Sequence, residues 1–253
     1  MHVLRRLHAA TRLPGVSLSA RLLAGWMRAF VPIVPTLAVL TFLVFACGVP
    51  APAHAEDMRF SLASPGNPNR CGARCPAVIT AVGEITDRTP YEFLNFVHDN
   101  VGSHNLHSAI FLDSPGGKVV AAMELGRIWR RLGATAIVAR ADPSSGARFP
   151  PGRCESACVY ALIGARRRVI PPGSIIGVHR MFFYDDESGA MGDGSSGRRH
   201  YDNGSMKAML SHYTRRMGVS PALISEAERI SSDRIHVLTR AEIVRYHLGS
   251  AGF

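Results

Sequence analysis

Ser156 and His179 could act together as a nucleophile and its general base. They lie in the stretch RCESACVYALIGARRRVIPPGSIIGVHR, which runs from Arg153 to Arg180 and places a serine, an apolar helix-like segment and a histidine in that order. A serine hydroxyl is a weak nucleophile at neutral pH, so it needs an imidazole within hydrogen-bond reach to take its proton. Two alternatives stay open: Ser156 as the N-cap of a helix, and His179 as a packed core histidine.

The segment IFLDSPGGKV, Ile110 to Val119, could supply the group that holds negative charge during acyl transfer. A short apolar strand ends there in a Ser-Pro-Gly-Gly turn, and glycine allows a backbone to approach a ligand closely. The helix expected to follow adds free amides and a helix dipole at the same place. These features favour an oxyanion site, although an ordinary turn is the alternative.

Alternating strand and helix patterns surround these residues and predict an α/β domain. The expected strands are 77–85, 108–112, 134–139 and the end of 169–178, and the expected helices begin at Thr89 and span 118–132, 156–163 and 205–217. A further helix is expected from Pro221, before a short strand and the closing segment LTRAEIVRYHLG. His179 would lie beyond the carboxyl end of a strand, where α/β folds collect site residues.

The SPGG turn, the serine at a helix start and the IGVH strand end resemble the Clp protease and signal peptide peptidase superfamily of serine peptidases. The resemblance covers about Ala77 to Gly249. It implies a ClpP/crotonase-like α/β fold, in which short, mostly parallel strands wind in a spiral with helices around them. We expect no cofactor and no metal.

The resemblance carries roles onto individual residues. Ser156 matches the family nucleophile and His179 its general base. The amides of Gly117 and Ala157 match the oxyanion hole, and Gly116 lies where substrate is bound.

The orienting acid of the triad is expected near the C-terminus. The segment DRIHVLTRAEIVRYHLG, Asp233 to Gly249, is similar to the Asp-Arg-aromatic run and later motif of the Clp proteolytic subunit, so Asp233 is the predicted acid. Asp185 and Asp186 follow His179 closely and are rival candidates. They lie in a Gly- and Ser-rich segment, 181–204, which we interpret as a lid, a recognition loop or an insertion.

The N-terminal 55 residues have the composition of an export signal. Met1–Ala55 contains no acidic residue and five arginines, all ahead of an apolar run at 30–49, and Ala53-His54-Ala55 has the form of a cleavage site. The run is also near the length of a membrane span, so a retained inner-membrane anchor is the alternative. Either interpretation places the domain outside the cytoplasm, in the periplasm or secreted.

Charge and composition limit the partners. The formal charge is +10 from 29 basic and 19 acidic side chains, and five of the basic ones belong to the leader. No basic stripe interleaved with aromatic residues follows, so nucleic acid is not an expected partner. His98, His104 and His107 are expected on the surface.

The sequence predicts three parts of the chain: the leader at 1–55, an irregular cysteine-containing arm at 56–76 and the α/β domain at 77–253.

Four cysteines after the leader fall in two pairs of identical spacing, Cys71/Cys75 and Cys154/Cys158. In an oxidising compartment they predict disulfides, with three connectivities open. A four-thiolate zinc site is the alternative, although such sites favour a reducing compartment.

The sequence thus predicts an extracytoplasmic serine peptidase with a peptide or protein substrate and a Ser-His-Asp triad. The resemblance is compatible with homo-oligomers, and no ATPase partner is expected because ATP-driven unfolding belongs to the cytoplasm. The alternatives are an inactive ClpP-like binding or membrane-anchored interaction protein and, with less support, a thioester hydrolase.

Overall fold

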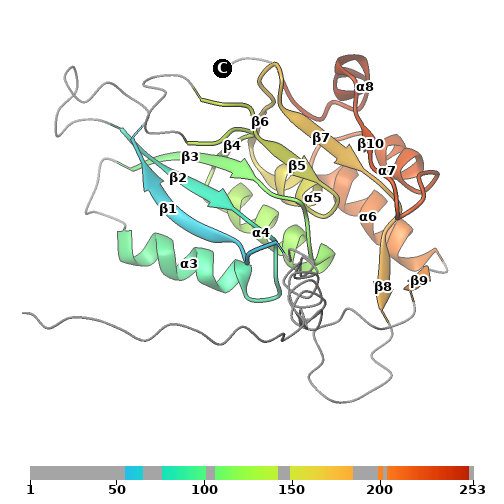
Figure 1. Ribbon diagram of the computed structural model, residues 1–253, viewed down its shortest axis with the longest axis horizontal. Coiled ribbons are helices and arrows are strands. Elements are labelled where there is room, and N and C mark those ends of the chain that lie inside the picture. Colours follow the sequence, from blue (N-terminus) through green and yellow to red (C-terminus); the bar gives the residue numbers. More distant parts are fainter. Residues whose placement is uncertain are drawn as a thin grey trace, which may run out of the picture. The chain divides into compact units, whose positions relative to one another are not determined.

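The computed structural model describes residues 55–64, 76–100, 106–141, 149–184, 199–201 and 204–250 (Figure 1). The chain divides into two compact units, residues 1–53 and 54–253, and every described residue belongs to the second. The predicted leader therefore lies outside the described residues, as do Cys71, Cys75, His104, Asp185 and Asp186. Among the helices that the structure describes, none has the length and hydropathy to cross a membrane.

A five-stranded sheet forms the larger part of the domain. Its strand order is β1-β2-β3-β4-β6, and all neighbours are parallel except β1, which is antiparallel to β2. Parallel strands require crossover connections, which the helices provide. The strands are β1 (Arg59–Ala63), β2 (Ala77–Val82), β3 (Leu106–Asp113), β4 (Thr135–Ile137) and β6 (Arg167–Val169).

A smaller sheet carries the residues of the candidate site. Its strand order is β10-β7-β5, with β5 (Arg153–Glu155) parallel to β7 (Ile175–Val178) and β10 (His236–Val237) antiparallel to it. The two sheets meet where Ser114, just after β3, forms a bridge with Cys154 in β5. A separate pair, β8 (Phe182–Tyr184) and β9 (Arg199–Tyr201), follows β7.

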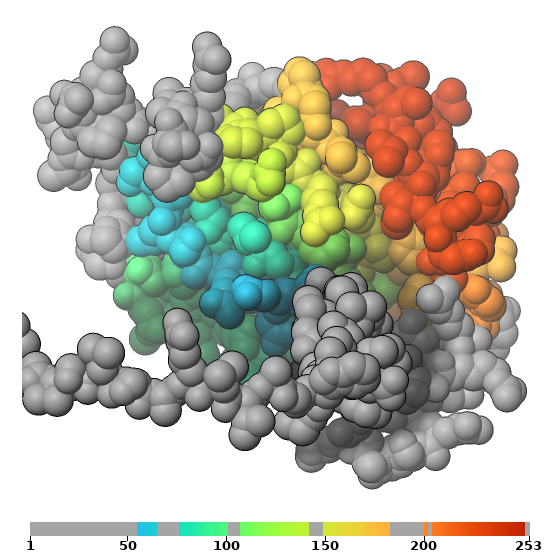
Figure 2. Space-filling view, in the orientation of Figure 1, coloured from blue at the N-terminus to red at the C-terminus, as the bar shows by residue number. Residues whose placement is uncertain are grey.

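Six helices are described: α3 (Thr89–Asn100), α4 (Val119–Arg131), α5 (Cys158–Gly164), α6 (Ser205–Arg216), α7 (Ala222–Ala227) and α8 (Arg240–Arg245). α5 is buried along its whole length, and it packs against α4. The core includes Trp129 from α4 and Phe93 from α3, whose rings make an edge contact at 6.0 Å. The early strands and the C-terminal helices lie on opposite sides of β5 and β7 in the space-filling view (Figure 2).

The α/β class with mostly parallel strands is confirmed. His98 and His107 are exposed, as expected. The prediction of an irregular arm over 56–76 is wrong for residues 59–63, which form β1. Phe60 and Leu62 alternate with polar residues and pack on the core, and this edge strand is joined to β2 by a 2.5 Å hydrogen bond between the hydroxyls of Ser61 and Thr80.

Candidate active site

Ser156 lies at the turn between β5 and α5 in an unusual backbone conformation. Its φ angle is 54°, and its amide donates to the Gly177 carbonyl in β7 at 2.8 Å. Few residues other than glycine adopt a positive φ, and such strain, of order 1–3 kcal/mol, tends to be retained at functional sites. The turn thus fixes the direction in which the Ser156 side chain leaves the backbone.

His179 directly follows β7 and contacts Ser156. Its Nε2 atom lies 2.8 Å from Ser156 Oγ, and its Nδ1 atom lies 2.8 Å from the Arg180 carbonyl oxygen. A carbonyl oxygen only accepts hydrogen bonds, so this contact requires the proton on Nδ1. Nε2 then carries a lone pair, which can accept the Ser156 hydroxyl proton as a general base must.

The structure does not support the two alternative roles, which were a helix N-cap for Ser156 and core packing for His179. The helix begins at Cys158, two residues later than predicted, with Ala157 as its N-cap, and no side chain caps it. Ser156 Oγ contacts the imidazole instead of the helix. His179 is buried, with 6% of its surface exposed, but its ring is directed at Ser156 and is therefore more than core packing.

The SPGG turn lies directly against Ser156. Gly116 has φ 115°, and a Cβ atom built on it would lie 2.8 Å from Ser156 Cβ and 3.1 Å from the Ala157 nitrogen. Any residue with a side chain would collide there. The Gly116 amide is itself occupied, because it donates to Ser114 Oγ at 3.1 Å.

The amides of Gly117 and Ala157 are both without an acceptor among the described residues. Gly117 is held from the other side by Ile85, whose amide donates to the Gly116 carbonyl and whose carbonyl accepts from Lys118, both at 2.7 Å. Two unused amides beside a serine nucleophile are what an oxyanion hole requires.

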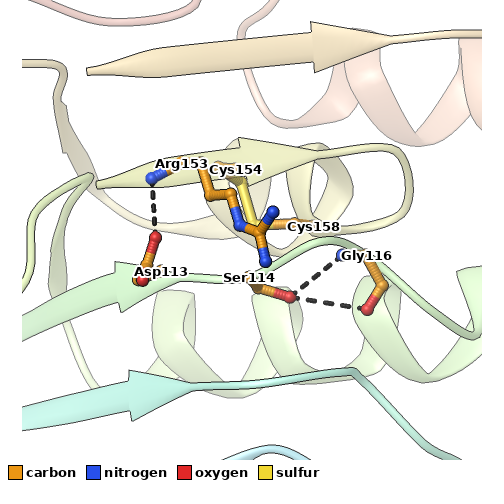
Figure 3. The surroundings of a disulfide bond; sticks show 6 residues. All are labelled: Asp113, Ser114, Gly116, Arg153, Cys154 and Cys158. Carbon is orange, nitrogen blue, oxygen red and sulfur yellow. Dashed lines mark hydrogen bonds between the residues drawn. A yellow bond between two sulfur atoms is a disulfide. The ribbon is translucent and has the colours of Figure 1, made fainter. Parts of the chain in front are cut away.

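Cys154 and Cys158 flank Ser156 in the sequence and form a disulfide bond with each other (Figure 3). Both side chains are fully buried. Of the three connectivities left open, the structure therefore has the one within this pair, and these two cysteines tie no arm to the site. They also supply no zinc ligands, and the described residues contain no cluster of metal-ligating side chains.

Asp113 and Ser114 support the site, and their roles were not predicted. Asp113 Oδ1 accepts a hydrogen bond from the Arg153 amide at 2.8 Å (Figure 3). Ser114 exchanges backbone hydrogen bonds with Arg153 and Glu155. These bonds fix the SPGG turn against the Ser156 turn. The sequence signal was present in the polar pair Asp-Ser at the end of an apolar strand.

Glu155, which precedes Ser156, lies in β5 opposite Gly177 of β7. Its Oε2 atom is 3.9 Å from the Arg153 guanidinium, and a Cβ atom on Gly177 would lie 3.0 Å from its Cγ. Only glycine at 177 leaves room for this side chain. The nearby guanidinium partly offsets a charge that would otherwise oppose an oxyanion.

Asp233, the predicted acid, lies in the exposed loop between α7 and β10. Its Oδ1 atom accepts a hydrogen bond from the Ser231 hydroxyl. Its role in a triad stays a prediction, and the rivals Asp185 and Asp186 lie outside the described residues. The contact seen at His179 Nδ1 is the Arg180 carbonyl, which can set the tautomer of the imidazole.

No known family model and no curated protein matches this chain. Among solved structures it is similar to a serine-to-alanine mutant of the 1510-N membrane-bound stomatin-specific protease, at 19% identity and a TM-score of 0.46, over 67% of this chain and 74% of that chain. It is also similar to a lysine-to-alanine mutant of that protease in complex with a substrate peptide, at 22% identity and a TM-score of 0.46, over 67% of this chain and 70% of that one. At these values neither similarity assigns an activity to this chain.

Proposed function

We propose that this protein is a serine peptidase with Ser156 as nucleophile and His179 as general base. The observation that carries the proposal is the 2.8 Å contact between Ser156 Oγ and His179 Nε2, made by a serine with positive φ. The amides of Gly117 and Ala157, which have no acceptor among the described residues, support it, since Ala157 follows Ser156 in sequence and Gly117 follows Gly116, which lies against Ser156. Together these groups form the minimum set for acyl transfer.

Ser156 Oγ attacks the carbonyl carbon of the scissile bond while its proton passes to His179 Nε2. The carbonyl oxygen takes on negative charge and accepts hydrogen bonds from the Gly117 and Ala157 amides. When the C–N bond breaks, Nε2 returns the proton to the leaving amine and an acyl ester remains on Ser156. Water then attacks the ester, its proton passes through Nε2 to Ser156 Oγ, and the free carboxylic acid leaves.

The peptide substrate is supported by the resemblance of SPGG, Ser156 and IGVH to the Clp and signal peptide peptidase superfamily. The same site could accept an acyl thioester, so substrate class is part of the test. We further propose that the enzyme acts outside the cytoplasm without an ATPase partner. The leader composition and the disulfide beside Ser156 support this location.

The test is covalent labelling of the full-length chain, purified in a non-ionic detergent, with a fluorophosphonate probe. We expect an adduct on Ser156, located by mass spectrometry of the digested protein. Ser156→Ala removes it, and His179→Ala slows it by a factor of at least about 1,000, as losing the base does in comparable triads. Ser220→Ala at a half-buried position and His98→Ala at an exposed one, both far from Ser156 in sequence, label at the wild-type rate.

Substrate class is tested on the same samples with a peptide library and with acyl thioesters. Cleavage of peptides that stops in Ser156→Ala supports the peptidase proposal. Hydrolysis of thioesters alone replaces peptidase with thioesterase. If the folded wild-type chain forms no adduct under either oxidising or reducing conditions, the serine peptidase proposal is overturned. The inactive ClpP-like binding protein is then the remaining interpretation.

Asp233 is tested separately, because its role comes from the resemblance alone. If its carboxylate orients His179, Asp233→Asn lowers the labelling rate steeply while leaving the melting temperature unchanged. An unchanged rate assigns the orientation of the imidazole to the Arg180 carbonyl, which accepts from Nδ1 at 2.8 Å.

A further inference from the structure

A cavity that is not lined by Ser156 or His179 lies between α4 and α6. Its volume is about 620 Å³, within the range usual for small-molecule sites. Met123, Tyr213 and Met217 give it an apolar lining, and the first two are almost fully buried. Tyr213 is fixed there because its hydroxyl donates to the Tyr160 carbonyl in α5 at 2.9 Å.

The remaining lining is strongly basic. It contains five arginines and a histidine and no acidic residue: Arg127, Arg130, Arg131, Arg166, Arg216 and His212. None of the five guanidinium groups forms an ion pair with a carboxylate among the described residues. Five like charges around one cavity repel one another, and a bound anion would relieve this repulsion.

Three separate elements bring these charges together. On α4, Arg127, Arg130 and Arg131 share a face because they are spaced by three and four residues. Arg216 comes from α6, and Arg166 comes from the turn after α5. A row of arginines on one helix is usually a solvated surface, whereas arginines that converge from three elements on one cavity form a site.

Two of the arginines are positioned by other contacts. The Arg127 guanidinium lies over the Tyr213 ring, 5.2 Å from its centre, and Arg166 Nε donates to the Arg130 carbonyl at 3.4 Å. Ordering before binding lowers the entropy that a ligand must overcome. The cavity is therefore partly prepared for an anion.

We propose that this cavity binds a phosphate group that is attached to an apolar moiety. The planar, forked guanidinium matches phosphate oxygens in pairs, which makes arginine the favoured residue for this anion. Met123, Met209 and Met217 provide flexible apolar surface for the attached moiety. The phosphate could belong to the headgroup of an anionic lipid or to a free phosphorylated molecule.

The test is isothermal titration calorimetry on the full-length chain in a non-ionic detergent at low ionic strength. The probes are inorganic pyrophosphate, a short-chain phosphatidic acid below its critical micelle concentration and, as a neutral control, a short-chain phosphatidylcholine. Binding of pyrophosphate with equal affinity indicates a free phosphate ligand. Much tighter binding of the phosphatidic acid indicates a lipid headgroup and supports the proposal, whereas equal affinity supports the phosphate site and overturns the apolar moiety.

The test variant is the triple substitution Arg127→Gln, Arg130→Gln and Arg216→Gln. We expect the affinity for the bound probe to fall at least tenfold. The control is Arg140→Gln, Arg215→Gln and Arg245→Gln, which removes the same charge from residues that do not line the cavity. It should lower the affinity by less than twofold.

Met209→Ser separates the two ligand sources further, because Met209 is partly exposed and lines the cavity. It should weaken the phosphatidic acid and leave pyrophosphate unchanged. Equal loss in the test and control triples overturns the proposal, since it would indicate net charge alone. Tighter binding of a polyglutamate peptide than of either phosphate probe also overturns it, in favour of an acidic protein partner.

The proposal does not rest on peptidase activity. Fluorophosphonate labelling of Ser156 is measured in the same preparations, and neither triple variant should change it. Loss of phosphate binding and loss of labelling are therefore separate results.

Discussion

Cys154 and Cys158 are joined by a disulfide bond that encloses Ser156 in a loop of five residues. Cys154 is anchored in β5, and Cys158 begins α5. Ser156 has its positive φ angle at the centre of this loop. The bond thus limits the conformations to which the strained Ser156 turn could relax.

Removing the disulfide should lower both stability and nucleophile reactivity. We expect the double variant Cys154→Ala, Cys158→Ala to lose about 2 kcal/mol of unfolding free energy, the loop-closure value for five residues. The fluorophosphonate labelling rate of Ser156 should fall about tenfold, because a turn relaxed by about 1–2 kcal/mol populates the reactive geometry less. Urea unfolding and labelling kinetics provide the two measurements.

Reductant supplies the control for this prediction. It should slow labelling of the wild type and have no effect on the double variant, which has no bond at this position. Equal labelling rates in the oxidised wild type and the folded double variant would show that the turn holds its conformation without the bond.

A side chain at Gly116 should abolish reactivity. Gly116→Ala places a Cβ atom 2.8 Å from Ser156 Cβ and from the Glu155 carbonyl oxygen, so the oxyanion turn and the nucleophile turn must separate. Labelling should slow at least about 100-fold, as for loss of an oxyanion donor. Gly133→Ala is the matched control: its φ is also positive, at 69°, but its Cβ would meet no atom within 4 Å.

The Gly133→Ala control should separate the effect of backbone strain from the effect of a collision with Ser156. Gly133→Ala should cost about 1 kcal/mol of stability, the usual penalty for a left-handed alanine, and leave labelling unchanged. If both variants label like the wild type, the SPGG turn is not part of the reactive site.

Local patterns predicted the parts of the site but not how they meet. The SPGG turn, the small residue after Ser156 and the strand before His179 are all short-range features, and they were visible in the sequence. The contact between Ser156 and His179 depends on the register of β5 against β7, in which Glu155 lies opposite Gly177. Pairing between strands is set by tertiary packing, which no local pattern encodes.

Two other features could not be predicted from the sequence, for related reasons. The positive φ of Ser156 arises from bonds on both sides of it, so residue propensity predicted a helix start instead. The spacing of Arg127, Arg130 and Arg131 places them on one face of α4. Only the packing of α6 showed that the Arg216 side chain faces the same cavity.

Arg168 should be a main determinant of stability in the C-terminal half. Its guanidinium donates to five carbonyl oxygens at distances of 2.7–3.4 Å: Ile163, Ala165, Met217, His247 and Leu248. Burial lowers the pKa of this side chain, and the hydrogen bonds compensate for its desolvation. Arg168→Ala should cost about 3 kcal/mol, since buried carbonyls lose charged donors.

The adjacent Arg167 is exposed and provides the control for Arg168. Arg167→Ala should change the unfolding free energy by less than about 0.5 kcal/mol. Arg168→Lys should restore only part of the loss, because an ammonium group cannot reproduce the planar fork of donors. Equal urea midpoints for the two alanine variants would contradict this role.

Glu242 should make the stability of the C-terminal segment depend on pH. It is the third residue of α8 and forms a capping box with Thr239, whose amide and hydroxyl both lie 2.7 Å from Glu242 Oε2. The hydrogen bond from the Thr239 amide, then that from the Thr239 hydroxyl, and a further one from His236 lower the pKa of this carboxyl to about 2. The folded state therefore binds the proton more weakly than the unfolded state.

The sign of the effect follows from this difference. A carboxyl whose pKa is lowered on folding stabilises the protein above its unfolded pKa, about 4.3, and this contribution is lost as the pH falls towards 2. Glu242→Gln keeps the shape of the capping box without the charge, so at pH 7 it should destabilise by about 0.5 kcal/mol. The gap between wild type and variant in urea unfolding should close between about pH 5 and pH 2. A gap that stayed constant over this range would show that the capping geometry, and not the carboxylate charge, stabilises the start of α8.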